Sequence, residues 1–139
     1  MAFLRREFSD HVLTLTMSSP DTRNALTGAE QFDDFVQTCA EINDDMSIRA
    51  VVLTGEGSAF CAGGNVKDMR DRAGMFSGDP FDQAGAYRMG IQRIPRAIQS
   101  LNVPIIAAVN ETGGIVTIEE HNIDGGLGCW TGNAPSYYK

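Results

Sequence analysis

The alternation of apolar and polar residues in this sequence predicts strands and helices that follow one another along the chain. Residues 3–6 and 12–17 indicate two short strands around a turn at residues 9–11, and threonines alternate in part with apolar residues in the second strand. The run at residues 49–54 is rich in β-branched residues and indicates a buried strand. Residues 104–109 are almost wholly apolar, so we expect a strand covered on both faces.

Apolar side chains at spacings of three and four residues predict a long helix after the second strand. Thr27 and Glu30 have the spacing of a capping box, so we expect the helix to start at Thr27 and to end at residues 43–45. Its buried stripe is predicted to be Phe32, Phe35, Val36, Cys39 and Ile42. Its solvated face is predicted to carry Glu30, Asp33, Asp34 and Glu41.

A second long helix is expected over residues 81–101, with a kink at Pro95. The residues predicted to form its buried stripe are Tyr87, Ile91, Ile94, Ile98 and Leu101. Residues 73–80 contain Gly, Ser and Pro and predict a loop, and residues 66–72 predict a short helix with Asn65 as its N-cap. Strands and helices in this order indicate an α/β fold with a βαβ-like arrangement.

The glycine-rich turn between residues 55 and 65 is the stretch where this pattern predicts chemistry. A strand that runs into such a turn and then into a helix presents backbone N–H groups that can bind an oxyanion or a phosphate. Gly63 and Gly64 are adjacent, and the missing Cβ atoms let the backbone approach a ligand closely. Many α/β proteins have such a turn, so the pattern alone does not define a reaction.

Composition narrows the class of protein. The 139 residues are 42% hydrophobic and 21% charged, which is typical of one modest globular domain. A net charge of −7 argues against nucleic acid or an anionic membrane as the main partner. No apolar run approaches the length of a membrane span, and the first residues lack the apolar stretch of a signal peptide. We therefore expect a cytoplasmic protein.

The three cysteines and the first histidine offer little sign of metal or nucleophilic chemistry. Cys39, Cys61 and Cys129 are widely spaced, which indicates neither a disulfide framework nor a zinc site. Cys61 is open to interpretation as a nucleophile, but no histidine or other base lies near it in the sequence. His11 falls in the predicted turn, where a surface residue is favoured over a catalytic base.

Four motifs in the first 110 residues resemble the crotonase (enoyl-CoA hydratase/isomerase) superfamily. Ser-Ala-Phe-Cys-Ala-Gly-Gly-Asn at residues 58–65 is similar to its first oxyanion-hole segment. Asn-Ala-Leu at 24–26, the strand at 48–55 and the strand at 103–110 are similar to three further elements, in the same order. The resemblance implies a partial crotonase-like spiral of ββα units, with residues 1–110 as an N-terminal half domain, because a complete crotonase domain is about twice this long.

The resemblance also implies a site. Gly64 N–H is expected to be one donor of the oxyanion hole, while Ala62 and Gly63 shape the pocket near the coenzyme A arm. Asn24 and Ala25 are expected to bind coenzyme A.

Two cations are further candidates for coenzyme A binding. Arg23 is open to two interpretations, a phosphate partner or a solvated loop arginine. Lys67 is likewise either a phosphate partner or part of a mixed surface with neighbouring acidic residues. Met75 and Phe76 lie in a loop that in this family borders the acyl pocket. No metal and no cofactor other than the coenzyme A thioester substrate is implied.

The family pattern is not continued in residues 111–139, which we interpret as an atypical tail of foreign or aberrant sequence. No glycine stands where the second oxyanion donor is expected, and the catalytic carboxylates are missing. Residues 111–128 instead resemble a short segment of the C-terminal domain of transketolases. Within it, residues 119–121 are favoured as a polar turn over an acid/base or metal cluster.

Whether this chain is itself an enzyme is therefore uncertain from the sequence. The resemblance implies an acyl-CoA thioester-processing protein of the enoyl-CoA hydratase/isomerase type, with an enolate stabilised by a backbone oxyanion hole and with impaired turnover. The alternative is a non-catalytic fragment that binds coenzyme A or associates with other subunits. A homo-oligomer is possible on the same resemblance, and a sugar-phosphate enzyme related to transketolases rests on the tail alone.

Overall fold

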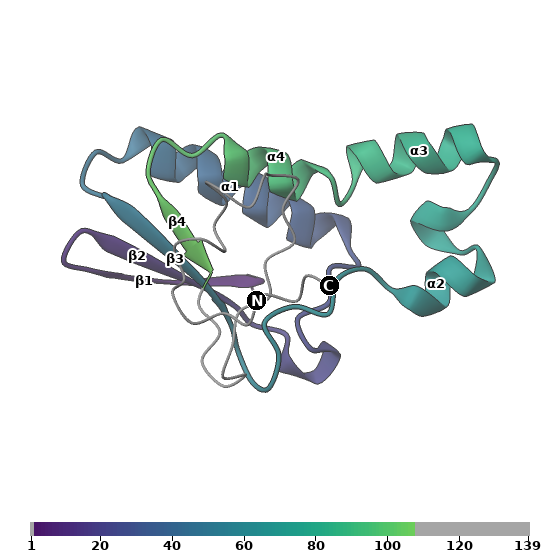
Figure 1. Ribbon diagram of the computed structural model, residues 1–139, viewed down its shortest axis with the longest axis horizontal. Helices are drawn as coiled ribbons and strands as arrows, with labels where there is room; N and C mark the ends of the chain where they lie inside the picture. The colour runs from purple at the N-terminus through teal and green to yellow at the C-terminus, as the bar shows by residue number, and fades with distance from the viewer. Residues whose placement is uncertain (1, 108–139) are drawn as a thin grey trace, which may run out of the picture. The chain divides into compact units, whose positions relative to one another are not determined.

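The computed structural model describes residues 2–107 (Figure 1). The predictions for the second oxyanion segment, the transketolase-like segment 111–128, residues 119–121 and Cys129 lie outside the described residues. By its backbone contacts the chain divides into residues 1–108 and residues 109–139, and the described fold belongs to the first unit.

A four-stranded sheet forms the base of the fold. It consists of β1 (Leu4–Ser9), β2 (Val12–Met17), β3 (Ala50–Gly55) and β4 (Ile105–Ala107), in the order β1-β2-β3-β4. β1 and β2 form an antiparallel hairpin, whereas β3 runs parallel to both β2 and β4. The strand predicted over residues 3–6 is therefore longer than expected. Its ladder with β2 continues to the pair Ser9–Val12, and only Asp10 and His11 turn the chain, both with positive φ.

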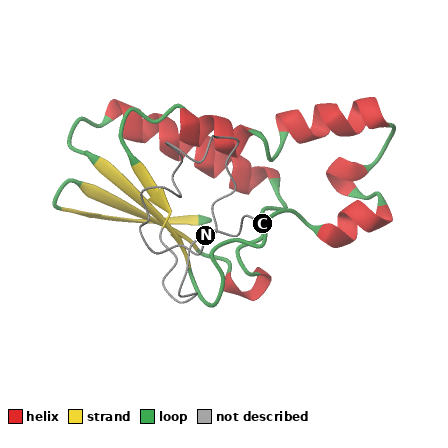
Figure 2. Cartoon of the chain, in the orientation of Figure 1, coloured by secondary structure: helices red, strands yellow, loops and turns green. Residues whose placement is uncertain are grey.

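Helices α1 (Ala29–Asp44) and α4 (Arg93–Gln99) lie on one face of this sheet (Figure 2). The predicted stripe of α1 is buried apart from Val36, which is half-buried, and Phe35 stacks on Phe3 at 6.1 Å between ring centroids. The apolar side chains that complete this core come from alternate positions of the sheet and are Leu4, Leu13, Leu15, Met17, Val51 and Leu53. The period-two and period-3.6 patterns thus meet in one layer of side chains.

The start of α1 differs from the predicted capping box. Gly28, not Thr27, is the N-cap, and the helix begins at Ala29. The Gln31 side chain caps the start of the helix, because its Oε1 accepts hydrogen bonds from the backbone N–H groups of Thr27 and Gly28 at 2.7 and 2.9 Å. Glutamine reaches back as the predicted Glu30 was expected to do, one position further along.

The single long helix predicted over residues 81–101 is wrong. The chain forms α3 (Pro80–Met89) and α4, separated at Gly90, whose φ and ψ of −104° and −116° are not helical. A Cβ at Gly90 would stand 2.8 Å from the Ala86 carbonyl oxygen and 3.3 Å from Phe32, so glycine lets the chain pass close to α1. Pro95 falls in the first turn of α4, where its missing N–H costs no helical hydrogen bond, and it makes no kink.

Three further expectations are corrected. Of the stripe predicted for residues 81–101, only Ile94 is buried, and the loop expected at 73–80 contains a 3₁₀ turn, η2 (Gly74–Phe76). Strand β4 lies at the edge of the described sheet, and Ile106 on it remains 59% exposed, so cover on both faces is not found among residues 2–107.

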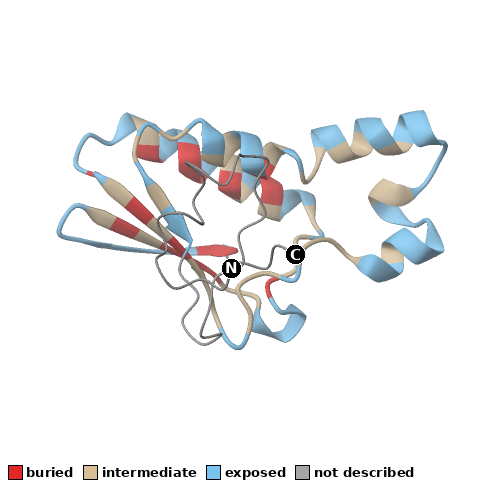
Figure 3. Cartoon of the chain, in the orientation of Figure 1, coloured by how far each residue is buried: buried red, intermediate tan, exposed pale blue. Residues whose placement is uncertain are grey.

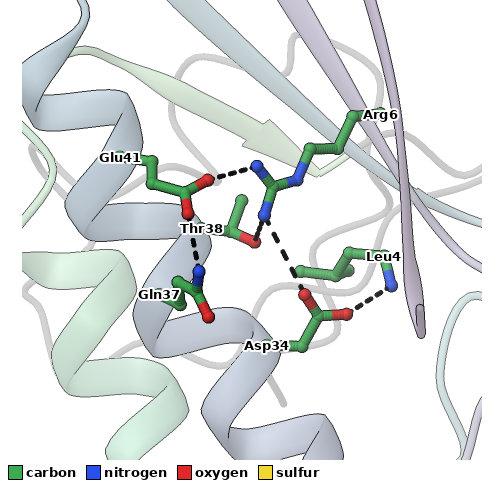
Figure 4. Close-up of polar contacts among 6 residues, drawn as sticks. All are labelled: Leu4, Arg6, Asp34, Gln37, Thr38 and Glu41. Atoms are coloured by element: carbon green, nitrogen blue, oxygen red, sulfur yellow. Dashed lines mark hydrogen bonds and ion pairs between the residues drawn. The ribbon is translucent and has the colours of Figure 1, made fainter.

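The acidic face of α1 is only partly solvated, because Asp34 turns toward β1. Its carboxylate accepts from the backbone N–H of Leu4 at 2.8 Å, on the edge strand (Figure 4). Arg6 on the same strand pairs with Glu41 and donates to the Thr38 hydroxyl at 2.7 Å, with Asp34 at 4.0 Å. This network attaches the edge strand to α1 and satisfies a backbone donor that would otherwise lie unpaired at the edge.

Candidate oxyanion turn and its supporting loop

The predicted turn follows β3 directly and leads into helix α2 (Val66–Asp71). Gly63 has a φ of 77°, in the left-handed region that favours glycine. Asn65 is the N-cap of α2 as predicted, and its side-chain oxygen accepts from Lys67 N–H at 3.0 Å. The turn thus reverses at Gly63 and presents Gly64 just before the helix.

The Gly64 N–H is an available donor. It has no hydrogen-bond partner among residues 2–107, whereas the two N–H groups before it are engaged. Ala62 N–H donates to the Arg23 carbonyl at 2.9 Å, and Gly63 N–H donates to the Cys61 sulfur at 3.3 Å. A backbone N–H without an internal partner can stabilise a developing negative charge on a ligand oxygen.

The loop at residues 23–26 lies against this turn through a pair of backbone hydrogen bonds. In addition to the bond from Ala62 to Arg23, Leu26 N–H donates to the Gly63 carbonyl at 2.8 Å. The structure therefore brings together the two segments that contain most of the predicted site residues. Their sequence positions alone, about 40 residues apart, do not show this pairing.

Asn24 lies between these segments with its side chain fully buried. Its side-chain Oδ1 accepts from Ser19 N–H at 2.9 Å, and its side-chain Nδ2 donates to the backbone carbonyls of Glu56 and Ala59 at 3.0 and 2.8 Å. All three bonds are to backbone. Asn24 itself has a φ of 56°, a conformation that asparagine tolerates better than most residues.

Gly55, at the end of β3, leaves the space that this arrangement requires. A Cβ there would lie 2.3 Å from the Phe60 carbonyl oxygen, 2.6 Å from that of Ala59 and 2.7 Å from the Asn24 amide nitrogen. Two backbone atoms cannot move aside as a flexible side chain would. The sequence did not predict this close approach, because Asn24 is distant in the chain and the turn brings Ala59 and Phe60 back onto the end of β3.

The two candidate cations are both exposed. Within residues 2–107 neither Arg23 nor Lys67 forms an ion pair, while the nearby Arg70 pairs with Asp71 at 2.7 Å. Arg23 has its backbone in the left-handed region, and its carbonyl is used by Ala62. The interpretations as phosphate partners or as surface residues therefore remain predictions. Ala25 is half-buried, and its carbonyl accepts from the Gln31 side chain at 2.9 Å.

Apolar side chains border Gly64 on the side of the helices. A Cβ built on Gly64 would stand 3.5 Å from Met69 Cε and 3.9 Å from Ile91 Cδ1, which is ordinary van der Waals contact. Met69 was not predicted as a wall of the site, and Ile91 was expected only to be buried. Of the two residues predicted for the acyl pocket, Met75 packs on the main core, and Phe76 stacks on Tyr87 at 6.0 Å.

The thiol of Cys61 and the ring of His11 take part in local structure. Cys61 donates to the Asn24 carbonyl at 3.2 Å, and within residues 2–107 no acidic or basic side chain hydrogen-bonds to its sulfur. His11 is exposed, as predicted for a surface residue, and its Nδ1 lies 2.9 Å from the Ser47 carbonyl. Cys39 is buried in the core as expected, and burial raises the pKa of its thiol.

A depression in the surface lies apart from the predicted site residues. This depression of about 900 Å³ covers the start of α1 and is lined by residues that include Glu30, Asp33 and Asp34. Its acidic wall disfavours phosphate. Within the described residues no group of His, Cys, Asp or Glu is arranged to hold a metal ion. No helix of residues 2–107 is long and apolar enough to cross a membrane.

An α/β layer with a glycine-rich turn occurs in many proteins, and comparison with known proteins narrows the class to one family. The family described as enoyl-CoA hydratase/isomerase matches residues 7–116. The chain belongs to this family, which confirms the crotonase resemblance and the crotonase-type α/β fold.

Sequence relatives agree with this assignment. The chain is 31% identical over 104 residues to a probable enoyl-CoA hydratase, echA6, of Mycobacterium leprae, with 73% of this chain and 37% of that protein covered. It is 36% identical over 100 residues to a probable enoyl-CoA hydratase, echA14, of Mycobacterium tuberculosis, with 72% and 36% covered. The chain therefore spans somewhat over a third of the length of these relatives.

Solved structures agree as well. A putative enoyl-CoA hydratase from Streptomyces coelicolor A3(2) superposes with a TM-score of 0.60 at 36% identity, covering 76% of this chain and 37% of the other. An enoyl-CoA hydratase from Mycobacterium smegmatis superposes with a TM-score of 0.62 at 30% identity, covering 76% and 38%.

Proposed function

We propose that this chain contributes the acyl-CoA-binding segment of a thioester-processing enzyme of the enoyl-CoA hydratase/isomerase type. In this proposal Gly64 N–H donates to the thioester carbonyl oxygen, on which negative charge builds as the reaction passes through an enolate-like state. The observation that carries it is the Gly64 N–H, which has no partner within residues 2–107, follows two engaged N–H groups and lies beside an apolar wall. Loss of one such donor typically costs about 2.7–4 kcal/mol of barrier.

The substrate in this proposal is a coenzyme A thioester, and no further cofactor is needed for the step. Polarisation of the carbonyl by backbone donors makes the adjacent carbon–carbon double bond, or the α-proton, reactive toward a base or water. The exposed cations Arg23, on the loop that lies against the turn, and Lys67, in α2 after it, are the proposed partners of the coenzyme A phosphates. Ala62 and Gly63 shape the space between them.

Hydration of an enoyl thioester also needs a second oxyanion donor and carboxylates that move protons. None of the proposed site residues within 2–107 supplies these groups. We therefore expect this chain to bind acyl-CoA with little or no hydratase turnover. Turnover comparable to that of a full-length family member, followed by the loss of ultraviolet absorbance of a 2-enoyl-CoA, would contradict this expectation.

The second candidate function is a non-catalytic module that binds coenzyme A or associates with other subunits. It needs only the exposed cations Arg23 and Lys67, which would contact the coenzyme A phosphates whatever the acyl group. Retained affinity for coenzyme A without an effect of the acyl group would support it.

A titration followed by ¹⁵N–¹H NMR separates the two functions. Acetyl-CoA, but not free coenzyme A, should move the Gly64 amide proton downfield, because only the thioester has the oxygen that the N–H would bind. Gly28 is the matched control, since its N–H is already donated to Gln31 at 2.9 Å, and its resonance should stay in place. Equal shifts at Gly64 with both ligands would favour the non-catalytic module, and no shift at Gly64 with either would overturn the proposed donor.

A further inference from the structure

Asn24 was predicted as a coenzyme A contact, but its side chain is buried and hydrogen-bonds only to backbone groups of the protein. It is 0% exposed, and each of its polar atoms is engaged by backbone from a different part of the chain. A side chain that is completely enclosed and fully hydrogen-bonded has no atom left for a ligand. Its effect on the site must therefore act through what it holds.

We infer that Asn24 is the positioning residue of the oxyanion turn. Its amide joins the loop at residue 19 to the carbonyls of Glu56 and Ala59, in the first part of the turn. Its own backbone carbonyl accepts the Cys61 thiol. Arg23, just before it, and Leu26, two residues after it, form the backbone bonds to Ala62 and Gly63. We call this set of hydrogen bonds between residues 19–26 and residues 56–63 the clamp. It determines the orientation of the Gly64 N–H.

The chemistry of the clamp selects asparagine. The position needs one acceptor and two donors on a short side chain, and only the amide of asparagine supplies all three at this reach. The positive φ of 56° is a conformation in which asparagine is enriched. Gly55 completes the arrangement, since any Cβ there would stand 2.7 Å from the Asn24 amide nitrogen.

The clamp matters for function because an oxyanion donor is effective only when it is oriented before the charge develops. If the two carbonyl partners of Asn24 were released, the segment 59–63 would be attached to the loop only by the bonds of Cys61, Ala62 and Gly63. The Gly64 N–H would then sample orientations that do not point at the thioester oxygen. This consequence rests on the proposed function, whereas the clamp itself can be tested without any ligand.

The first test uses amide hydrogen exchange of the unmodified chain, followed by NMR. The amides of Ser19, Leu26 and Ala62 are all hydrogen-bonded within the clamp. We expect these three amides to share one opening equilibrium and to respond equally to low concentrations of urea. Independent opening, with different protection and different urea dependence, would overturn the inference.

The second test replaces Asn24 with aspartate, which keeps the acceptor for Ser19 but lacks both donors. Asn24→Asp should speed exchange at Leu26 and Ala62 by roughly 10- to 100-fold, while Val51 and Leu15 in the core strands keep their protection. The matched control is Asn43→Asp. Asn43 makes the same kind of bridge elsewhere, with its amide donated to the Ser100 carbonyl and its oxygen accepting from Asn102 N–H, both at 2.8 Å. This control should leave Leu26 and Ala62 unchanged.

The outcomes separate the clamp from the proposed function. Selective exchange at Leu26 and Ala62, with a weakened acetyl-CoA shift at Gly64, supports both. If Asn24→Asp speeds exchange selectively but the unmodified chain shows no acetyl-CoA shift at Gly64, the clamp is supported and the proposed function is contradicted. Unchanged protection in Asn24→Asp, or protection lost equally in the core, overturns the positioning role. If Asn24→Asp does not fold, the shared opening measured in the unmodified chain decides.

Discussion

The two sides of Gly64 are held in very different ways. On its N-terminal side, the loop at residues 19–26 and the turn at 55–63 are tied by the clamp around Asn24 and rest on a buried core. On its C-terminal side, α2, η2 and α3 form an arm, residues 66–89, in which none of these three elements has a buried residue. Figure 3 shows the buried positions gathered on the sheet and α1, with the arm exposed or half-buried.

This difference suggests a division of labour around the proposed site. The donor belongs to the strongly held side, where its orientation is determined by hydrogen bonds to backbone. Met69, which borders Gly64, belongs to the arm, and Ile91 lies just beyond it. If the proposed function holds, the site would combine a fixed polar group with an apolar wall that little buried contact restrains, and acyl groups of different size would fit without moving the donor.

The largest expected difference is between removing an aromatic ring from the core, at Phe35, and removing one from the arm, at Phe81. Phe35 is buried under the sheet, and Phe35→Ala should lower the free energy of unfolding by about 3–5 kcal/mol through lost burial and a cavity. Phe81 on the arm is 87% exposed, so Phe81→Ala should change it by less than about 0.5 kcal/mol. Urea unfolding of both variants measures the difference, and similar losses would mean that the arm is packed as tightly as the core.

The next effect contrasts two glycines. Gly55→Ala would place a Cβ 2.3 Å from a backbone oxygen, and we expect a loss of about 3 kcal/mol. Gly85 lies in α3 with nothing within 4 Å of its Cβ position, so Gly85→Ala should stabilise the protein by about 0.5–1 kcal/mol. Chemical denaturation should therefore give opposite signs, and a stabilising Gly55→Ala would show that the clamp tolerates a side chain.

A smaller effect distinguishes the two glycines of the turn. Gly63 has a positive φ and open space around its Cβ position, so Gly63→Ala should cost about 1–2 kcal/mol from backbone strain alone. Gly64 has neither a positive φ nor a close contact, and Gly64→Ala should stay within about 0.5 kcal/mol. If the two substitutions cost the same, strain at Gly63 is not what shapes the turn. The comparison is made by urea unfolding at one pH.

The smallest effect is a pH dependence at the edge of the core. The hydrogen bond from Arg6, together with Gln37 and the charge of Arg6, lowers the pKa of Glu41 in the folded chain. The stabilisation is therefore present above the unfolded pKa and is lost as the pH falls through the lower folded value. Glu41→Gln should flatten the loss of stability between about pH 6 and pH 3, because this carboxylate no longer takes up a proton.

A second carboxylate, Asp45, should add a separate pH dependence of the stability in the same pH range. The side-chain hydroxyl and then the backbone N–H of Ser47 lower the pKa of Asp45, so Asp45 contributes in the same direction. Asp45→Asn should flatten the same acid limb independently of Glu41, because the two groups do not share a partner. A pH profile unchanged in Glu41→Gln would contradict the assigned role of the Arg6 contact.

Local patterns in the sequence were sufficient for most individual elements. The strand at Val12–Met17, the stripe of α1 with its end at Asp44, and Asn65 as N-cap were all predicted, because each depends on residues within one or two turns of one another. The motifs at 24–26 and 58–65 also marked the family. The roles assigned to their residues stay predictions.

The features that were missed depend on contacts between distant residues. Gly90 interrupts the predicted helix where the chain passes Phe32, and Asp34 leaves the solvated face to bind the edge of β1. Nothing within a few residues of either position reports these partners. The capping of α1 was missed for a different reason, because Gln31 and Gly28 are local partners that replaced an equally plausible local pair.

By itself the sequence determined the periodicity of the strands and helices, the glycines that permit the turn and the family to which the chain belongs. Only the tertiary structure decided that residues 23–26 lie against residues 62–63 and that the Asn24 amide is enclosed between them. It also decided that the Gly64 N–H has no partner among residues 2–107. The physical reason is that periodicity arises from neighbours along the chain, whereas burial and hydrogen-bond pairing arise from segments that meet only when the sheet and its helix assemble.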